Sequence, residues 1–198
     1  KYAIEHWTRV PVEIELASEF RYRDPVLGPN TLVVAISQSG ETADTLEAVR
    51  HARSQKARVL AVCNTNGAQI PRESDAVLYT HAGPEIAVAS TKAFLAQVIA
   101  NYLVGLALAQ ARGTKYPDEV AVIYRELEAM AEKVERVLDQ TDDIRSIGRQ
   151  FAGSNTLLFI GRNVGYPVAL EGALKLKELA YIHAEGFAAG ELKHGPIA

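Results

Sequence analysis

Four polar side chains around one glycine are the residues of this chain best suited to bind an anion. In the stretch SQSGET, Gly40 is surrounded by three hydroxyl groups and one amide, those of Ser37, Gln38, Ser39 and Thr42. No cation lies among them, which suits a compact phosphate monoester. The stretch has neither the lysine of a nucleotide-binding P-loop nor the glycine pattern of a dinucleotide site. A polar capped turn that binds nothing is the alternative interpretation.

A second candidate is an acid-base stripe in ALEGALKLKELAYIH. Glu171, Lys175 and Glu178 share one helical face, because positions i, i+4 and i+7 lie together. A carboxylate beside a lysine in a partly desolvated cleft can have its pKa adjusted for proton transfer. The alternative is an ordinary salt-bridge stripe in solvent. Apolar residues occupy most of the remaining circumference, so we expect this helix to be largely buried.

Two further sets of side chains have both a structural and a functional interpretation. His194 lies in KHGP, where nearby glycines predict a shaped loop that presents an imidazole; an inert exposed histidine is the alternative. Ser90 and Thr91 precede a long uncharged helix, and we expect them to cap it, with ligand contact as the alternative.

The elements around the first candidate indicate an α/β fold. The run Leu32–Ile36 shows no alternation and predicts a strand buried on both faces of a parallel sheet. A helix over Thr42–Ser54 and a second strand over Arg58–Cys63 complete a βαβ unit, and residues 76–80 predict a third strand. The unpaired N–H groups of the turn then face the ligand-binding end of a doubly wound parallel-sheet sandwich.

The rest of the chain predicts more elements and a second domain. We expect a strand over Val12–Leu16, a short helix over Ala17–Arg23 and one long helix over Asp118–Leu138. Thr156–Ile160 is a second continuous apolar strand, and NTLLFIG there resembles NTLVVAI at residues 30–36. We therefore place a first domain at residues 1–150 and the start of a second at residues 151–198.

Composition narrows the class of protein. The chain has 198 residues, 48% of them hydrophobic, and a net charge of −3, which predicts a soluble globular protein without nucleic-acid or membrane partners. A single cysteine, Cys63, fits the cytoplasm and is expected to be buried. Ala93–Ala111 is uncharged and nearly long enough to span a membrane, but Gln97, Asn101 and Gln110 favour a helix buried in the fold.

Several blocks together closely resemble the isomerase half of the glutamine:fructose-6-phosphate amidotransferase family. They are SQSGETADT, ASEFRY, ESD, EIAVASTKAF, ALEGALKLKE, YIHAE and AAGELKHGP, within residues 17–197. The resemblance implies two SIS (sugar isomerase) domains, each a doubly wound α/β sandwich. The first would be nearly complete but without its first strand, and the second truncated. The implied parent enzyme is a transferase that makes glucosamine 6-phosphate from fructose 6-phosphate and L-glutamine, without metal or organic cofactor.

The resemblance also implies roles for individual residues. The loop that holds the sugar phosphate matches Ser37, Gln38, Ser39 and Thr42. Val88 matches a position that lines the sugar, and Glu178 the general base that moves a proton between C1 and C2 of the fructose-derived imine. Lys175 matches a neighbour implicated in proton handling. His194 matches a residue linked to ring opening that reaches the site from the other subunit, which implies a homodimer.

Parts of the family pattern are absent from these residues. They are the N-terminal glutaminase domain, a partner on the same parent chain, and the C-terminal tail with a Schiff-base lysine. We therefore expect the 198 residues alone neither to hydrolyse glutamine nor to make glucosamine 6-phosphate. The alternatives are a phosphosugar isomerase or deglycase with SIS domains, and a regulator that binds a sugar phosphate without chemistry.

Overall fold

Two compact units make up the chain in the computed structural model, which describes residues 1–197. The first unit contains Ala3–Ala121, and the second begins at Val122. The division at residues 121–122 falls within the helices that connect the two sheets. The domain boundary near residue 150 therefore stays a prediction.

The first unit is built on a parallel three-stranded sheet in the order β1-β2-β3. Its strands are β1 (Leu32–Ser37), β2 (Arg58–Cys63) and β3 (Ala76–Tyr79). The crossover from β1 to β2 is α3 (Ala43–Ser54), and the shorter α4 (Gln69–Glu73) leads to β3. The predicted βαβ unit and third strand are confirmed.

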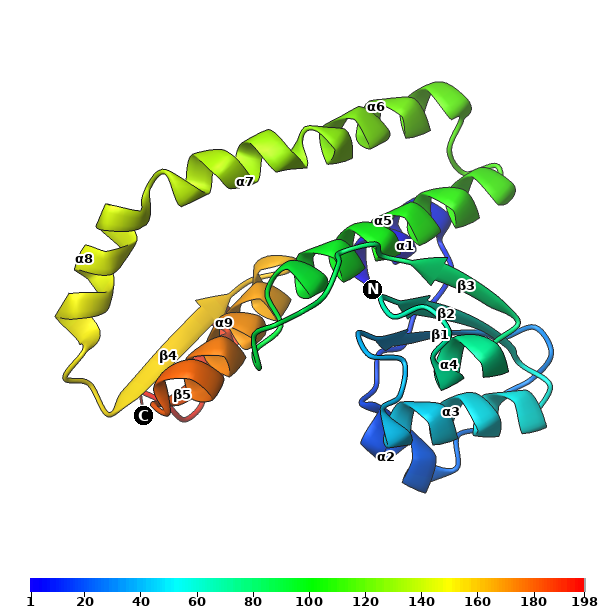
Figure 1. Cartoon of the computed structure of the whole chain (residues 1–198), viewed down its shortest axis with the longest axis horizontal. Coiled ribbons are helices and arrows are strands. Elements are labelled where there is room, and N and C mark those ends of the chain that lie inside the picture. Colours follow the sequence, from blue (N-terminus) through cyan, green and yellow to red (C-terminus); the bar gives the residue numbers. More distant parts are fainter. Residues whose placement is uncertain (198) are drawn as a thin grey trace. The chain divides into compact units, whose positions relative to one another are not determined.

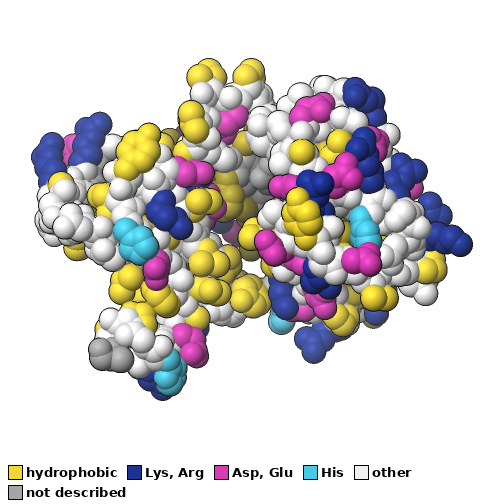
Figure 2. All heavy atoms as spheres, turned by 90° about the horizontal axis from the view of Figure 1, so that it is seen from below, with side chains coloured by type: hydrophobic (Ala, Val, Ile, Leu, Met, Phe, Trp, Pro, Cys, Tyr) yellow, Lys and Arg dark blue, Asp and Glu magenta, His cyan; other side chains and the backbone are white. Residues whose placement is uncertain are grey.

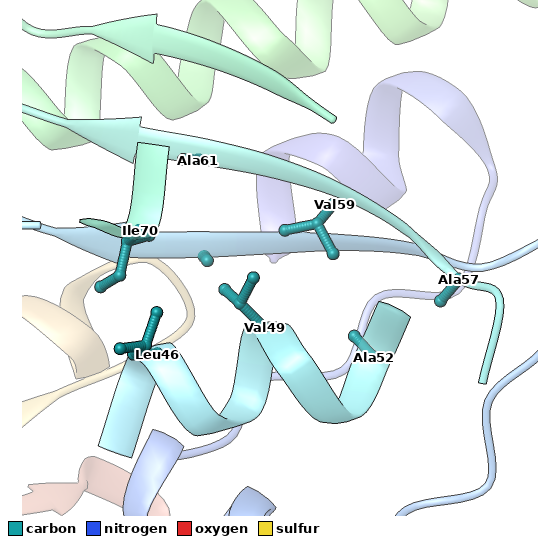
Figure 3. Packing of buried hydrophobic residues seen from close by; sticks show 8 residues of the cluster. Leu46, Val49, Ala52, Ala57, Val59, Ala61 and Ile70 are labelled. Atoms are coloured by element: carbon teal, nitrogen blue, oxygen red, sulfur yellow. The ribbon is translucent and has the colours of Figure 1, made fainter. Parts of the chain in front are cut away.

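Helices cover both faces of this sheet. Figure 1 shows α3 on one face and α5 (Lys92–Ala111) on the other, so the predicted doubly wound α/β arrangement is confirmed for this unit. Figure 3 shows the core between α3 and the sheet, where Val49, Val59 and Ile70 are at most 1% exposed. Burying each such side chain stabilises the fold by about 1.5–3 kcal/mol. This core fixes where β1 ends and α3 begins.

The long helix α5 packs against β2 and against α1 (Tyr2–Thr8). The rings of Trp7 and Tyr102 meet edge to face with centroids 5.5 Å apart. At Gly105 an added Cβ would lie 2.9 Å from Ile4, so glycine permits the close approach of the two helices. These contacts agree with a helix that belongs to the fold.

By length and composition, α5 is also the one helix within residues 1–197 that is apolar enough to cross a membrane. The mean hydropathy of its most apolar window is 1.5, and 33% of that window is buried. A core helix of a soluble protein passes the same test. The absence of a membrane partner therefore stays a prediction.

The predicted strand over Val12–Leu16 is wrong. These residues have no regular structure, and Ile14 and Leu16 are 74% and 72% exposed. Alternation of apolar and acidic residues is not sufficient for a strand, which needs a neighbouring strand to pair with. The helix predicted directly after it is confirmed as α2 (Ala17–Arg23).

The prediction that β1 is buried on both faces is also wrong. Leu32 is 42% exposed and Ile36 is 45% exposed. In the described residues β1 lies at the edge of the sheet, whereas the central strand β2 is mostly buried. The apolar run therefore identified the strand correctly but not its place in the sheet.

Charged side chains of opposite sign lie in pairs on the outward side of α2 and α3. Arg50 contacts Glu47 at 2.7 Å and Glu73 at 2.8 Å, and Arg23 contacts Glu15 at 2.6 Å. Figure 2 shows acidic and basic side chains next to one another over this face of the first unit. Such exposed pairs contribute about 0–1 kcal/mol each.

The second unit contains one parallel pair of strands and the helix that connects them. Strands β4 (Thr156–Gly161) and β5 (His183–Ala188) pair in parallel, and α9 (Gly165–Ala180) is their crossover. An added Cβ at Gly172 of α9 would lie 2.9 Å from the Phe159 ring, so the helix lies close on β4. The other elements from residue 117 onward are α6 (Pro117–Glu128), whose first residues belong to the first unit, α7 (Met130–Leu138), α8 (Thr141–Phe151) and the 3-10 turn η1 (Ala189–Glu191).

Three predictions for this part are corrected. The single helix over Asp118–Leu138 is interrupted at Ala129, whose ψ of 0° leaves the regular helical range. The glycines of AEGFAAGELKHGPIA predict a loop over this whole segment, but its first residues pair with β4 as part of β5 (His183–Ala188), and only the part around KHGP is a turn. The helix α9 is not largely buried, because Leu174 and Leu179 are 41% and 63% exposed.

Candidate functional site

The loop between β1 and α3 brings two of its hydroxyl groups together. The Oγ of Ser37 accepts the N–H of Gly40 at 3.0 Å and lies 3.2 Å from the Oγ1 of Thr42. Ser37 is only 6% exposed, whereas Thr42, the N-cap residue of α3, is exposed. The loop therefore carries a row of hydroxyls from the buried end of the strand to the surface end of the helix.

Gly40 cannot be replaced without changing the shape of this loop. Its φ of +71° lies in the left-handed region, which side chains rarely adopt. An added Cβ would also lie 2.6 Å from the Cβ of Ala68 and 2.7 Å from the Sγ of Cys63. The turn between β2 and α4 thus packs directly under the loop. Cys63 is fully buried there, as predicted.

Hydroxyl protons are available donors of this loop, whereas two N–H groups of the turn, those of Gly40 and Glu41, are bonded within it. The Oγ of Ser39 accepts the N–H of Glu41 at 3.2 Å, as Ser37 does for Gly40. A serine whose oxygen accepts an N–H keeps its own proton to donate. Thr42 makes no side-chain cap on α3, so the positive end of the helix faces the same region. The expectation of free N–H groups in the turn is wrong at Gly40 and Glu41.

The two carboxylates of this segment are both engaged with other partners. The Oε1 of Glu41 accepts the N–H of Gln69 at 2.8 Å, and the Oδ1 of Asp44 accepts from the Nη1 of Arg21 at 2.8 Å. The hydrogen bond to Asp44 raises the pKa of Arg21. Arg21 lies on α2, and its guanidinium offsets the negative charge of Asp44 in the first turn of α3. Sequence reasoning did not single out Arg21. Because both carboxylates accept hydrogen bonds from outside the loop, the loop can present its donors to an anion.

The acid-base stripe predicted on α9 is confirmed as a set of contacts. The Nζ of Lys175 lies 2.5 Å from the Oε2 of Glu178 and 3.5 Å from the Oε1 of Glu171. The three side chains are between 23% and 35% exposed, which makes them partly desolvated. Burial lowers the pKa of Lys175, but the hydrogen bond to Glu178 and the charge of Glu171 outweigh it, so the pKa is raised. Lys175 is therefore held as a cation.

The other two predicted site residues lie on exposed surfaces. Val88, in the loop between β3 and α5, is fully exposed. His194 is exposed in the turn after η1, and its backbone N–H donates to the backbone carbonyl of Glu191 at 2.9 Å. No group of three His, Cys, Asp or Glu side chains suited to a metal is found within residues 1–197.

The predicted capping of α5 by Ser90 and Thr91 is wrong. Thr91 occupies the N-cap position, but its side chain makes no cap. The carboxylate of Glu85 accepts the N–H groups of Ala93 at 3.1 Å and of Thr91 at 3.3 Å instead. The hydrogen bond from Ala93 is the main reason that the pKa of Glu85 is lowered. This acidic cap was not visible from local sequence, because it reaches across a loop.

The family model described as the SIS domain matches residues 1–107 and 150–198, well over half of the chain. The chain belongs to the SIS-domain family. Both matched segments contain a parallel βαβ unit, which agrees with the α/β class. The phosphate-loop candidates lie in the first SIS match, and Lys175, Glu178 and His194 lie in the second.

Relatives with established names match this SIS chain over its whole length. It is 79% identical to glutamine–fructose-6-phosphate aminotransferase [isomerizing] of Mycolicibacterium smegmatis and 78% identical to the enzyme of that name from Mycobacterium tuberculosis. Each match covers 100% of this chain and 32% of the relative, so the chain spans about a third of their length.

A solved structure agrees with these matches. The C-terminal domain of glucosamine-fructose-6-phosphate aminotransferase from Francisella tularensis is 44% identical, with a TM-score of 0.96. That match covers 100% of this chain and 56% of the other. The resemblance stated from the sequence blocks is confirmed.

Proposed function

We propose that the chain is part of the isomerase half of a glutamine–fructose-6-phosphate aminotransferase and binds the phosphate group of fructose 6-phosphate at the Ser37–Thr42 loop. Identity of 79% over the whole chain to a relative of that name supports the assignment. The observation that carries the binding proposal is the set of hydroxyls around Gly40 at the start of α3.

A phosphate monoester fits this loop by charge and by donors. Ser39 has a hydroxyl proton to offer, the hydrogen-bonded pair Ser37 and Thr42 offers another, and the half-buried Gln38 adds an amide. A hydrogen bond to a charged group contributes about 1.5–3 kcal/mol. The N-terminus of α3 adds about 0.3–1 kcal/mol for an anion. Because Asp44 and Glu41 are engaged elsewhere, their charges oppose the ester less.

The acid-base stripe on α9 supports the chemical part of the proposal. Glu178 takes a proton from C1 of the fructose-derived imine and returns it to C2, which converts the ketose imine into the aldose glucosamine 6-phosphate. Lys175 keeps the carboxylate in place through its 2.5 Å hydrogen bond. His194 promotes ring opening from the partner subunit of a homodimer, and Val88 lines the sugar. Ammonia comes from glutamine at a glutaminase domain of the same parent chain, in the cytoplasm.

The test uses the full-length gene product that contains this chain. We expect it to form glucosamine 6-phosphate from fructose 6-phosphate and L-glutamine, and Ser39→Ala to raise the KM for fructose 6-phosphate by about tenfold, the equivalent of one lost charge-assisted hydrogen bond. Ser146→Ala on the exposed surface of α8 is the matched control and should change nothing. An unchanged KM in Ser39→Ala would remove the loop from substrate binding.

The same preparation separates the proposal from its alternatives. Glu178→Gln should lower kcat by about 10²–10⁴-fold, the range for loss of a general base. A regulator that only binds a sugar phosphate would show no turnover in the wild type. A phosphosugar isomerase or deglycase would interconvert hexose phosphates without glutamine. Either result would replace the proposed activity.

A further inference from the structure

Asn64 lies directly after β2 and touches the phosphate loop through its backbone. Its N–H donates to the carbonyl oxygen of Gln38 at 3.2 Å. Ser37 and Cys63 are the last paired residues of β1 and β2, so this bond extends the ladder one residue into the loop. The backbone position of Asn64 is therefore tied to that of Gln38.

The side chain of Asn64 makes three hydrogen bonds in another direction, to the segment that follows β3. Its Oδ1 accepts from the Oγ1 of Thr80 at 3.0 Å and from the N–H of Ala82 at 2.8 Å. Its Nδ2 donates to the carbonyl of Gly83 at 2.7 Å. Because oxygen and nitrogen both have partners, the amide has one orientation, and no carboxylate can reproduce the donor.

The segment held in this way turns sharply, since His81 and Gly83 have φ of +52° and +69°. Without the bonds to Asn64 this turn would have few constraints, because His81 and Gly83 are both exposed. Its path fixes where the following loop, residues 84–91, begins.

The far end of that loop is also fixed. Glu85 joins it to the first turn of α5, and Ala89 is buried at 1% exposure. With Ala89 turned inward, the neighbouring Val88 is directed outward and is fully exposed. The loop is therefore anchored by Asn64 before it, and by Glu85 and Ala89 within it.

The geometry points to Asn64 as a positioning residue that sets the distance between the phosphate loop and the loop that carries Val88. This inference rests on the proposed function, in which the first loop holds the phosphate and the second lines the sugar. The described hydrogen bonds of Asn64 all go to protein groups, those of Gln38, Thr80, Ala82 and Gly83. Its side-chain amide positions the loop that lines the sugar of a bound ester, whereas its backbone N–H holds the phosphate loop through Gln38.

The test is Asn64→Asp in the full-length protein, a change that keeps the size of the side chain but replaces the Nδ2 donor by an oxygen facing the carbonyl of Gly83. We expect the KM for fructose 6-phosphate to rise by about tenfold, within the range for a substrate group displaced by about 1 Å. The inhibition constant of inorganic phosphate should not change, because the backbone bond to Gln38 remains. Asn66→Asp, the same change at an exposed position of the same turn, is the control and should not alter either constant.

Thr80→Val is a second variant that removes only one of the three side-chain bonds, and it should raise the KM by a smaller factor. An unchanged KM in both variants would overturn the inference. Equal weakening of fructose 6-phosphate and inorganic phosphate would also overturn it, since Asn64 would then act on the phosphate loop itself. A wild-type protein without turnover of fructose 6-phosphate would overturn the proposed function, and the positioning role with it.

Discussion

The hydroxyl oxygens of Ser37 and Thr42 lie 3.2 Å apart, one on the last residue of β1 and the other on the residue before α3. Gly40 makes this short distance possible, because its left-handed backbone turns the chain between them. A strand, a tight turn and a helix start thus concentrate donors at one point. Open α/β folds bind ligands at this end of their strands.

Thr42→Val should weaken binding of fructose 6-phosphate, because it keeps the shape of the side chain and removes a hydroxyl donor. We expect a rise in KM of about tenfold or more, from the loss of about 1.5–3 kcal/mol of charge-assisted hydrogen bonding. Thr42→Ser keeps the hydroxyl and should stay close to the wild type. Equal KM values for the valine and serine variants would exclude this hydroxyl as a ligand.

Gly40→Ala should destabilise the first unit through both backbone and packing. A left-handed conformation costs a non-glycine residue about 1–2 kcal/mol, and overpacking a tight site adds about 1–3 kcal/mol. Gly67→Ala is a matched control, since Gly67 has a φ of +73° with nothing within 4 Å of an added Cβ. Urea unfolding should give the larger loss of free energy for Gly40→Ala. Equal losses would mean that the contacts with Ala68 and Cys63 do not constrain the loop.

Local sequence was sufficient to predict the polar turn between β1 and α3 and the stripe on α9. A continuous apolar run, a polar turn and a helix start are all contained within residues 32–54, and the contacts of Lys175 arise from helical spacing alone. Glu171, Lys175 and Glu178 could therefore be placed on one face of the helix before any fold was known. The roles of these residues in catalysis stay predictions.

Features that depend on residues far apart in the sequence could not be predicted in the same way. VEIEL alternates like a strand but finds no partner, and β5 is a strand because β4 lies beside it. Glu85 caps α5 from across a loop, where Ser90 and Thr91 were the local candidates. Arg21 and Asn64 likewise act on segments 23 and 16–19 residues away.

Acid should remove the stabilising contribution of Glu73. The hydrogen bond from Arg50 lowers the pKa of Glu73 to about 2. A carboxyl whose folded pKa lies below its unfolded value of about 4.3 stabilises the fold above that value and loses this effect as pH falls toward 2. Glu73→Gln should therefore lower the Tm at pH 7 but have little effect near pH 2. The same substitution in an Arg50→Gln background should show a much smaller pH dependence, because only Gln69 and Arg53 then lower the pKa of Glu73; a difference that persists at pH 2 would contradict the pairing.

Lys175→Met should impair the chemical step more than substrate binding. The ammonium holds Glu178 at 2.5 Å, and we expect a fall in kcat of about tenfold or more with little change in KM, because the general base loses its orientation. Glu171→Gln, which alters the longer 3.5 Å contact, should have a weaker effect. Steady-state kinetics on the full-length protein measures kcat and KM for both variants. A larger loss for Glu171→Gln would assign the important acid to the other side of Lys175.

The most direct test of phosphate binding is a crystal structure of the full-length protein with glucosamine 6-phosphate. We predict phosphate oxygens within hydrogen-bond distance of the hydroxyls of Ser37, Ser39 and Thr42, beside the first turn of α3. A phosphate group held elsewhere, with these three hydroxyls facing only solvent, would contradict the account.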